Sequence, residues 1–460
     1  MTDSHSESLI RASSPIAPST SWILASGSPR RRSLLRQLGL PFSVKPSRVD
    51  ERIHLGESPH DFALRMAVEK ALDVAYRVSQ PSQGTDVLVV GGDTVVALGS
   101  QALGKPTDES HAVQMLSELS GRAHDVWSGW AVARVVADQA PQVICSGVSR
   151  GVVHMREISP SEREVYIRSG EPMDKAGSYG IQGAGGRFVE KLSGSLYGVI
   201  GIPIADLTEA LVAQDLIPSP DFARRSISLR ERVATAAWRS GRAVDEVQVL
   251  AVSKHHPAER LFLAGAHDFK HFGESYLQEL SAKRPQVEGA WTEVTTLQGS
   301  SGSISSAPTW HYIGKIQTNK ARHIGASVDW VHGVSRESEA RRLAEGAAQA
   351  GHTLQVCLQV NVAGEEQKGG VSPDQVAPLL ERCRAYDALN VVGLMTFPPL
   401  GSSEESRAHF RALRHLRDEL ASTHGALPHL SMGTSHDFEV AVEEGATWVR
   451  LGRALFGERA

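Results

Sequence analysis

Residues 430–457 read LSMGTSHDFEVAVEEGATWVRLGRALFG, two short apolar segments separated by a helical pattern. The first segment, LSMG, ends at a run of small polar residues, and the second, TWVRLG, follows the helical pattern directly. A strand, a helix and a strand in close succession are typical of neighbouring parallel strands. The same unit recurs upstream. The further expected strands, in chain order, are VQVLAVS, FKHFGE, WHYIG, DWVHGV, LQVCLQVNV and NVVGLMTF.

Eight such strands, most of them followed by a helical pattern, predict a (β/α)8 barrel over residues 225–460, and a region of roughly 240 residues suits that fold. An amphipathic segment, ISLRERVATAAWRSG, leads into the first strand. Residues 287–308, rich in Gly and Ser around GSSGSISSAP, are expected to form an inserted surface loop. The predicted fold class of this half is therefore α/β.

A break in the pattern separates the barrel from an earlier domain. Pro218 and Pro220 flank Ser219, and proline cannot continue a preceding helix, so residues 217–224 are expected to be a linker. Upstream, residues 21–216 alternate strands such as DVLVVGGDTVVAL with helical segments such as FALRMAVEKALDVAYRV, which predicts a second α/β domain. Residues 1–20 are polar and Ser-rich, and we expect a disordered tail there.

Composition excludes several classes of partner. The chain has 48 Lys and Arg against 52 Asp and Glu among 460 residues, so its field attracts neither nucleic acid nor an anionic membrane. There is no apolar run of about 18 residues that could span a bilayer. The three cysteines, Cys145, Cys357 and Cys383, lack the spacing of a zinc site. We expect a soluble cytoplasmic protein with no nucleic-acid or membrane partner.

A basic helix start follows the first strand. Ser26 precedes Ser28 and Pro29, which can cap and begin a helix, and Arg30 and Arg31 come next. Unpaired N–H groups at a helix start, with arginines beside them, favour an anionic ligand. Taken alone, an ordinary capped helix with a solvated basic face explains these residues better.

Acidic and basic residues further along strengthen the anion hypothesis. Asp93 interrupts an apolar strand, where a carboxylate is costly unless it binds a cation or donors. With Glu51 it could hold a divalent metal such as Mg²⁺ or Mn²⁺, while Lys70 and Lys105 neutralise a polyphosphate. Asp93 would then orient or deprotonate the attacking water. Each lysine by itself could equally be a solvated surface amine.

The motifs LASGSPRRRSLL, VEKA, GGDTVV, LGKP, LSGRAHDV and MDKAGSYGIQG, in that order, resemble the Maf-type nucleoside triphosphate pyrophosphatases over nearly all of residues 20–216. The resemblance implies a Maf/ITPase-like fold, cleavage of the α–β bond of a nucleoside triphosphate, Asp93 as proton acceptor and Lys175 at the substrate. Within the family, the combination of Arg30, Thr94 and Gln182 is similar to the branch that acts on dTTP and UTP. Since Maf-type modules often pair, it also implies a possible homodimer.

A lysine and a phosphate-binding pattern occupy one end of the expected barrel. Lys254 follows the first strand, at the end where such barrels place their sites, and a partly desolvated lysine there can form a Schiff base. Alone, a solvated lysine is the more common explanation. The end of the seventh strand holds Ser431, Gly433, Thr434 and Ser435, and the eighth strand and its loop hold Arg450, Gly452 and Arg453. The loops after these two strands are where this fold commonly seats phosphate. The pairing predicts pyridoxal 5'-phosphate (PLP).

The motifs AVSK, HFGESYLQEL, WHYIGKIQTNK, QVNV, LSMGTSHDFEVAV and VRLGRALFG resemble the pyridoxal phosphate homeostasis family, which shares its fold with the N-terminal domain of alanine racemase. The resemblance covers about residues 225–458. It implies Lys254 as the lysine that binds PLP and Arg450 near the pyridine nitrogen. It also implies phosphate contacts from Ser435, Gly452 and Arg453. Asn361 is a plausible cofactor residue, and a satisfied loop residue explains it equally well. Ser275 and Thr434 depart from the family pattern.

The preferred hypothesis is a bifunctional chain that hydrolyses dTTP or UTP in one half and carries PLP in the other. One alternative is a nucleotide-sensing regulator of cell division with a PLP storage module. Another is an amino acid racemase, which is disfavoured because the chain stops after the barrel. Alanine racemases use a further β-rich domain.

Overall fold

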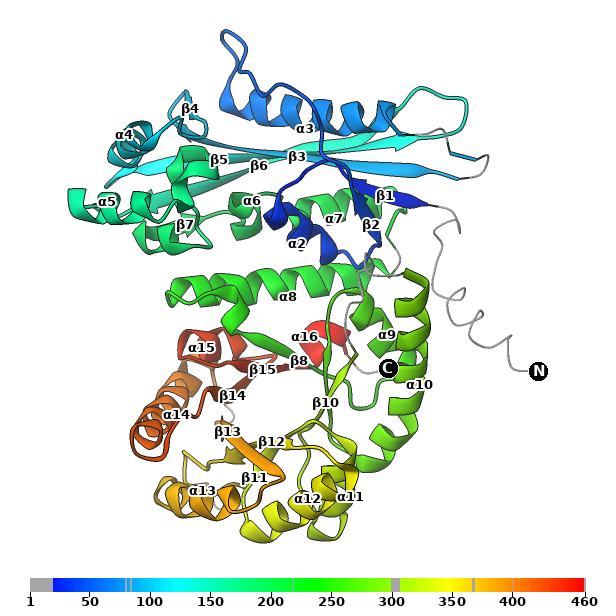
Figure 1. Cartoon of the computed structure of the whole chain (residues 1–460), viewed down its shortest axis with the longest axis vertical. Helices are drawn as coiled ribbons and strands as arrows, with labels where there is room; N and C mark the ends of the chain where they lie inside the picture. Colours follow the sequence, from blue (N-terminus) through cyan, green and yellow to red (C-terminus); the bar gives the residue numbers. More distant parts are fainter. Residues whose placement is uncertain are drawn as a thin grey trace. The chain divides into compact units, whose positions relative to one another are not determined.

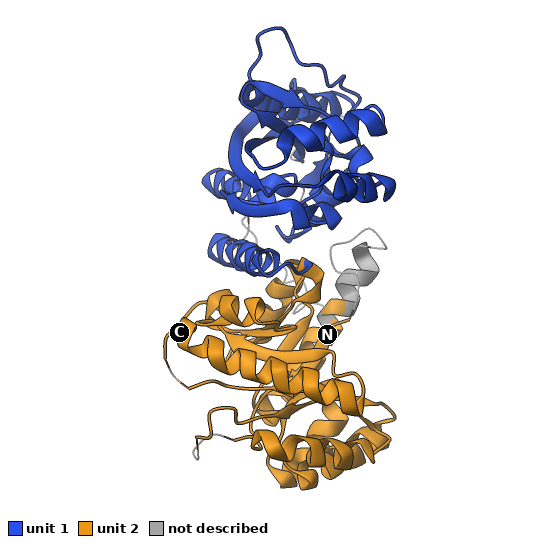
Figure 2. Cartoon of the chain, turned by 90° about the vertical axis from the view of Figure 1, so that its left-hand side faces the viewer, with its two compact units in different colours: residues 1–243, 301–303 blue, residues 244–300, 304–460 orange. Residues whose placement is uncertain are grey.

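The computed structural model describes residues 20–78, 81–82, 85–217, 219–298, 307–365, 369–399 and 401–458. Two compact units meet in the sequence between Ala243 and Val244 (Figure 2). The expected polar tail lies outside the described residues, apart from residue 20. Each unit has its own sheet and is described by itself below.

Unit 1 is built on one mixed sheet, in the strand order β2-β1-β3-β5-β6-β7 with β4 paired to β3 (Figure 1). β1 runs parallel to β2 and β3, whereas β3, β5, β6 and β7 pair antiparallel. The strands are β1 (Ser21–Leu24), β2 (Phe42–Val44), β3 (Val87–Leu98), β4 (Gln101–Leu103), β5 (Ala123–Val135), β6 (Gln142–Met155) and β7 (Val189–Ser193). The α/β class predicted for this half is confirmed.

Helix α3 (Pro59–Tyr76) lies unusually close to the sheet because glycines face it. A Cβ on Gly91 of β3 would stand 2.2 Å from the Ala67 carbonyl oxygen, and one on Gly129 of β5 would stand 2.1 Å from that of Ala63. This approach brings the middle of α3 against β3. The other helices of unit 1 are α2 (Pro29–Arg36), α4 (Glu109–Leu119), α5 (Pro160–Arg168), α6 (Leu196–Ile200), α7 (Ile204–Ala213) and α8 (Pro220–Arg239).

Helix α8 begins inside the segment expected to be a linker. Its N-cap is Ser219 and its first residue is Pro220, so residues 220–224 are helical. The helix contacts α6 and α7, and its Glu231 accepts a hydrogen bond from the Ser195 hydroxyl at 2.5 Å. These contacts group α8 with unit 1, whereas the sequence pattern placed residues from 225 onward with the barrel.

Unit 2 contains a closed barrel in the order β10-β11-β12-β13-β14-β15-β8-β9, with every pairing parallel, as predicted. The strands are β8 (Gln248–Val252), β9 (His271–Glu274), β10 (Thr309–Tyr312), β11 (Trp330–Val334), β12 (Leu354–Gln359), β13 (Leu389–Met395), β14 (His429–Thr434) and β15 (Trp448–Leu451). The helices are α9 (Ala258–Ala266), α10 (Leu277–Gln298), α11 (Thr318–Ser327), α12 (Glu337–Ala350), α13 (Val376–Arg384), α14 (Ser403–His424), α15 (Phe438–Glu443) and α16 (Arg453–Phe456).

The prediction of an inserted loop over residues 287–308 is wrong for its first half, which is helical. Helix α10 continues to Gln298, and Val287 and Trp291, one turn apart, are buried. The Trp291 ring packs so closely on α9 that a Cβ on Gly265 would stand 2.3 Å from it. Burial of that indole outweighs the weak helical pattern around it. Residues 299–306 lie outside the described residues.

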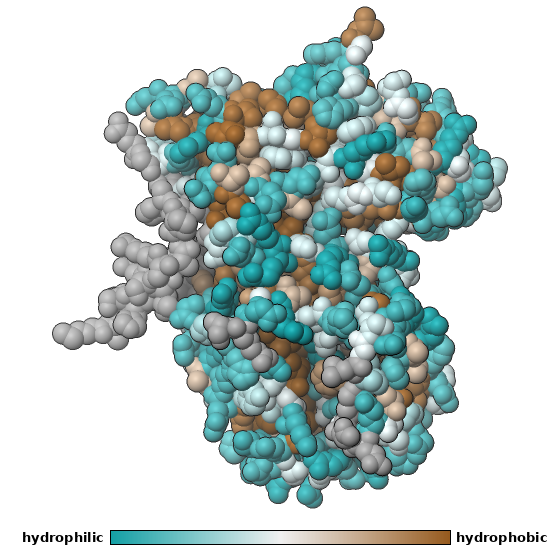
Figure 3. All heavy atoms as spheres, turned by 180° about the vertical axis from the view of Figure 1, so that it is seen from behind, coloured by the Kyte–Doolittle hydropathy of each residue, from teal (hydrophilic) through white to brown (hydrophobic). Residues whose placement is uncertain are grey.

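Within the described residues, no helix is long and apolar enough to cross a membrane. In Figure 3, hydrophobic and hydrophilic residues alternate over the visible face of both units.

Candidate functional sites

A cavity of about 830 Å³ opens in unit 1 where the start of α2, the middle of β3 and the loop after η1 (Glu171–Asp174) come together. The sequence predicted ten site residues for this half, and all ten line the cavity. They are Ser26, Arg30, Arg31, Glu51, Lys70, Asp93, Thr94, Lys105, Lys175 and Gln182. The sheet and α3 thus assemble residues that are up to 156 positions apart, from Ser26 to Gln182.

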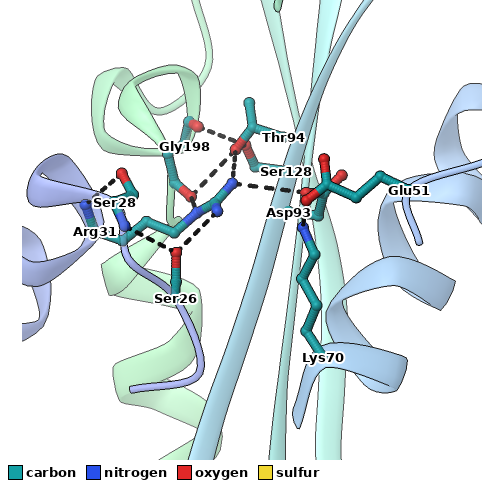
Figure 4. Close-up of polar contacts among 10 residues, drawn as sticks. Ser26, Ser28, Arg31, Glu51, Lys70, Asp93, Thr94, Ser128 and Gly198 are labelled. Atoms are coloured by element: carbon teal, nitrogen blue, oxygen red, sulfur yellow. Dashed lines mark hydrogen bonds and ion pairs between the residues drawn. The ribbon is translucent and has the colours of Figure 1, made fainter. Parts of the chain in front are cut away.

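Asp93 lies between two cations (Figure 4). The Lys70 ammonium donates to Asp93 Oδ1 at 2.7 Å and to Glu51 Oε1 at 2.6 Å, and an Arg31 Nη lies 3.9 Å from Asp93 Oδ1. Lys70 and Asp93 are 5% and 6% exposed, so these charges are held out of water. Burial raises the pKa of Glu51, but the hydrogen bond and charge of Lys70, with Lys105 and Arg31, outweigh it and leave that pKa lowered.

Arg31 is clamped from several sides, which fixes its guanidinium at the cavity wall. Its Nε donates to the Gly201 carbonyl at 2.9 Å, and its Nη groups donate to the hydroxyls of Ser26 and Thr94, each at 3.3 Å. Burial lowers the pKa of Arg31 from its ordinary value. The clamp also contains Ser128, which the sequence did not single out. The Ser128 hydroxyl donates to the Gly198 carbonyl at 2.6 Å and lies 3.0 Å from that of Thr94.

The remaining predicted residues lie at the mouth of the cavity. Lys105 and Gln182 are exposed, and Arg30 is half-buried. The Lys175 ammonium donates to the Glu171 carbonyl and to Asp174, both at 2.6 Å. The exposed Lys105 at the mouth and the buried charges at the base suit a polyanion that binds with one end inside the cavity.

Two acids, Glu51 and Asp93, are the candidate metal ligands of this cavity. Within the described ranges, no group of three or more His, Cys, Asp or Glu side chains gathers as a metal site. Glu51 Oε1 and Asp93 Oδ1 both accept from Lys70 Nζ, so one cationic group already contacts both acids. Mg²⁺ is commonly held by one or two carboxylates together with substrate phosphates, and two acids are therefore enough.

Unit 2 has a cavity of about 230 Å³ at the carboxyl ends of the barrel strands. Five of the six predicted cofactor residues line it: Lys254, Ser435, Arg450, Gly452 and Arg453. Lys254 is half-buried and follows β8 by two residues. The Ser435 hydroxyl accepts from the Ala454 N–H at 3.1 Å, which ties the loops after β14 and β15 together. The lining also holds His256, Ile313, Phe397 and Thr434.

Arg450 is the most constrained polar residue of this cavity. It is 3% exposed, and one of its Nη atoms donates to the Ser431 carbonyl at 2.6 Å and to the Ser431 hydroxyl at 2.8 Å. The other donates to the Thr396 carbonyl at 2.8 Å, and the Phe397 ring centre lies 4.2 Å from Cζ. Burial lowers the pKa of Arg450 to about 10. Its Nε is buried and has no hydrogen-bond partner among the described residues.

Two residues considered for this site lie elsewhere. Asn361 is not among the residues lining the cavity, because its amide bonds the Glu365 backbone in both directions, at 2.8 and 3.2 Å. It therefore closes a local loop, the alternative left open above. Ser431 was grouped with the phosphate loops, but it is fully buried beneath Arg450 and does not line the cavity.

Both halves of the chain match known families. Residues 21–214 match the model of Maf-like proteins, and residues 228–460 match that of the alanine racemase N-terminal domain. A dTTP/UTP pyrophosphatase of Alcanivorax borkumensis is 45% identical over 42% of this chain and 95% of its own length. A pyridoxal phosphate homeostasis protein of Aquifex aeolicus is 40% identical over 50% of this chain and 94% of its own length. The chain belongs to both families.

A solved structure is also similar to the second half. PipY of Synechococcus elongatus, crystallised with PLP bound, is 35% identical and matches with a TM-score of 0.41, covering 50% of this chain and 100% of its own. The Maf-like unit and the homeostasis-family barrel were both expected from the sequence motifs, and both expectations are confirmed.

Proposed function

We propose that unit 1 hydrolyses dTTP or UTP to the nucleoside monophosphate and pyrophosphate with the help of Mg²⁺ or Mn²⁺. The observation that carries this is the arrangement around Asp93, an acid flanked by Lys70 and Arg31 at the base of a cavity rimmed by further cations. A triphosphate needs that positive lining, and its hydrolysis needs one acid to orient or deprotonate water. The names of the similar proteins support the substrate class.

In this proposal each of the cavity residues has a separate role. Glu51 and Asp93 would hold the metal, which would draw charge from the phosphate oxygens. Lys70 and Arg31 would neutralise the triphosphate, while Lys105 and Lys175 would receive it at the mouth. Gln182 and Arg30 would contact the base, since an amide presents a donor and an acceptor together.

The test is a pyrophosphate-release assay across the common nucleoside triphosphates, with and without Mg²⁺. We expect dTTP and UTP to be hydrolysed fastest and chelation to stop the reaction. Asp93→Asn keeps the shape of the side chain and should lower kcat by at least about a hundredfold, because the proton acceptor is lost. Equal turnover in Asp93→Asn would remove Asp93 from the mechanism, and a flat nucleotide profile would remove the dTTP/UTP assignment.

We propose that unit 2 binds PLP and takes part in its homeostasis rather than in turnover. PLP supplies an aldehyde that reacts with a lysine amine, and Lys254 would be that lysine. Ser435, Gly452 and Arg453 would hold the phosphate, and Arg450 would face the ring. An arginine at the pyridine nitrogen leaves that nitrogen unprotonated, which weakens the ring as an electron sink and suits a carrier.

The purified chain should show the visible absorption of lysine-bound PLP, and borohydride should then attach the cofactor irreversibly to Lys254. Peptide mass mapping locates the label, with Lys254→Ala as the control that takes up none. Label on another lysine would refute the assignment. Racemisation of alanine at ordinary enzymatic rates would refute the carrier role.

A further inference from the structure

Five polar side chains form one hydrogen-bonded chain across the interior of the barrel. They come from five strands: His271 on β9, His311 on β10, His332 on β11, Ser431 on β14 and Arg450 on β15. His271 Nδ1 lies 3.1 Å from His311 Nε2, and His311 Nδ1 lies 2.9 Å from His332 Nε2. His332 Nδ1 lies 2.7 Å from the Ser431 hydroxyl, which accepts from Arg450 at 2.8 Å.

The chain is closed to water except at His271, which is half-buried. His311, His332 and Ser431 are completely buried, and Arg450 is 3% exposed. Buried polar groups are stable only when each donor finds an acceptor, so the hydrogens in this chain are not free to point either way.

The direction of the chain follows from Arg450, which can only donate. The Ser431 hydroxyl accepts from Arg450 and also contacts His332 Nδ1. We infer that its own hydrogen goes to that nitrogen, since a buried hydroxyl hydrogen without an acceptor is costly. His332 then carries its proton on Nε2 and donates to His311 Nδ1.

The same step repeats along the barrel. Because His311 Nδ1 accepts, the proton of His311 is on Nε2, and it donates to His271 Nδ1. Burial agrees with neutral rings, since it lowers the pKa of His332 to about 3 and that of His271 to about 4. Every donor in the chain consequently points away from Arg450.

We propose that Ser431 and His332 are positioning residues for the cofactor pocket, which hold the Arg450 guanidinium at the cavity wall through a one-directional chain of Nε2-protonated histidines. The inference rests on the proposed binding of PLP by unit 2. Arg450 donates to neutral oxygens of Ser431 and Thr396, and the pKa that burial lowers to about 10 still lies well above pH 7. Arg450 therefore stays a charged donor toward the ring of the ligand.

The first test reads the histidine tautomers directly. The full chain is labelled with ¹⁵N-histidine and its two-bond nitrogen–proton correlations are recorded at pH 7, with and without PLP. His271, His311 and His332 should each give the pattern of a neutral ring protonated on Nε2. Among the 19 histidines, each signal is assigned by its loss in the corresponding His→Gln variant. An Nδ1-protonated or charged ring at any of the three positions overturns the proposed direction.

The second test measures binding. Ser431→Ala and His332→Gln should each raise the Kd for PLP about tenfold, the size expected for losing one hydrogen bond to a charged group. Each should also shift the absorption maximum of the bound cofactor, which a purely structural role would not do. The Kd of the double variant should be no higher than that of the single variant with the higher Kd, because both residues act through one chain.

His429→Gln is the matched control. His429 lies in the same barrel, with its ring 5.2 Å from that of Trp330, but its Nδ1 contacts the Thr447 hydroxyl and it is outside the chain. It should change the Kd less than about twofold. If circular dichroism shows that His332→Gln does not fold, the binding test rests on Ser431→Ala, because that change removes a single oxygen. Unchanged Kd and absorption in Ser431→Ala would overturn the proposal. Failure of the unsubstituted chain to bind PLP would refute the function proposed for unit 2, while the tautomers still test the direction of the chain.

Discussion

At the scale of single residues, Lys70 links structure and chemistry in unit 1. Its ammonium is 5% exposed and pairs with Asp93 and Glu51, so it neutralises two acids that would otherwise face each other. Removing one partner of a buried ion pair costs far more than the pair is worth, because the remaining charge stays buried without compensation.

We therefore expect Lys70→Met to lower the free energy of unfolding of unit 1 by about 3 kcal/mol at pH 7 as well as its activity. Lys105→Met is the control. Lys105 lines the same cavity but is exposed, so its loss should cost activity and less than about 0.5 kcal/mol of stability. Urea unfolding of both variants decides, and equal stability of the two would contradict the buried pairing.

The buried histidines give unit 2 a pH dependence of known sign. From an ordinary value of 6.5, burial lowers the pKa of His332 to about 3 and that of His271 to about 4. Below pH 6.5 the unfolded chain binds protons that the folded barrel refuses, so stability falls as pH falls, down to the folded-state pKa values. Above pH 6.5 these groups contribute nothing to the dependence.

Each such histidine should remove about 2 kcal/mol from the free energy of unfolding between pH 6.5 and pH 5. His332→Gln should therefore reduce the loss between pH 7 and pH 5 by about that amount, measured by urea unfolding at both pH values. The exposed His415→Gln should leave the loss as it is in the unsubstituted chain. If the free energy of unfolding of His332→Gln fell between pH 7 and pH 5 as much as that of the unsubstituted chain, His332 would titrate like a solvated ring.

At the scale of elements, helices α11 and α12 pack backbone to backbone through glycines. A Cβ on Gly346 of α12 would stand 1.9 Å from the Arg322 carbonyl oxygen, and one on Gly325 of α11 would stand 2.2 Å from that of Leu343. Neighbouring backbone cannot move aside as a flexible side chain can. The two helices thus depend on the absence of side chains at these crossing points.

Gly346→Ala and Gly289→Ala should consequently change stability in opposite directions, although both glycines lie inside helices. At Gly289 of α10 a Cβ meets nothing within 4 Å, so alanine should stabilise unit 2 by about 0.5–1 kcal/mol through helix propensity. At Gly346 the clash should destabilise it by about 1–3 kcal/mol. Thermal unfolding of the two variants measures the difference, and stabilisation by both would show that α11 and α12 separate easily.

At the scale of the whole molecule, each unit holds a complete set of site residues. The cavity of unit 1 is lined by residues 25–201, and the cavity of unit 2 by residues 252–457. No lining residue is shared, so each proposed activity needs only its own unit.

Asp93→Asn should therefore leave the Kd for PLP within about twofold, and Lys254→Ala should leave pyrophosphate release within about twofold, as expected of independent sites that share no residue. Both variants are measured in both assays on the full chain. A loss of pyrophosphate release in Lys254→Ala would show that occupancy of the barrel controls the first unit.

The local sequence pattern was enough to predict the helices and strands that carry most of the site residues. The apolar run around Asp93 predicted β3, and the ordered motifs from Ser26 to Gln182 predicted ten residues that the structure gathers around one cavity. The closed barrel was predicted because each strand and helix has its own hydrophobic periodicity in the sequence. The misread start of the 287–308 segment shows the limit of that approach, since the burial of Trp291 depends on α9 and not on neighbouring sequence.

The amino-acid sequence by itself determined the two units, their families and the identity of most cavity residues, because periodicity and motif order are properties of neighbouring positions. Only the tertiary structure decided that Asn361 closes a local loop, that Ser431 lies beneath Arg450, and that histidines from three strands line up behind it. The physical reason is closure of the barrel. It brings inward-facing positions of β9, β10 and β11 against β14 and β15, across more than a hundred residues of chain, and no local pattern encodes that meeting.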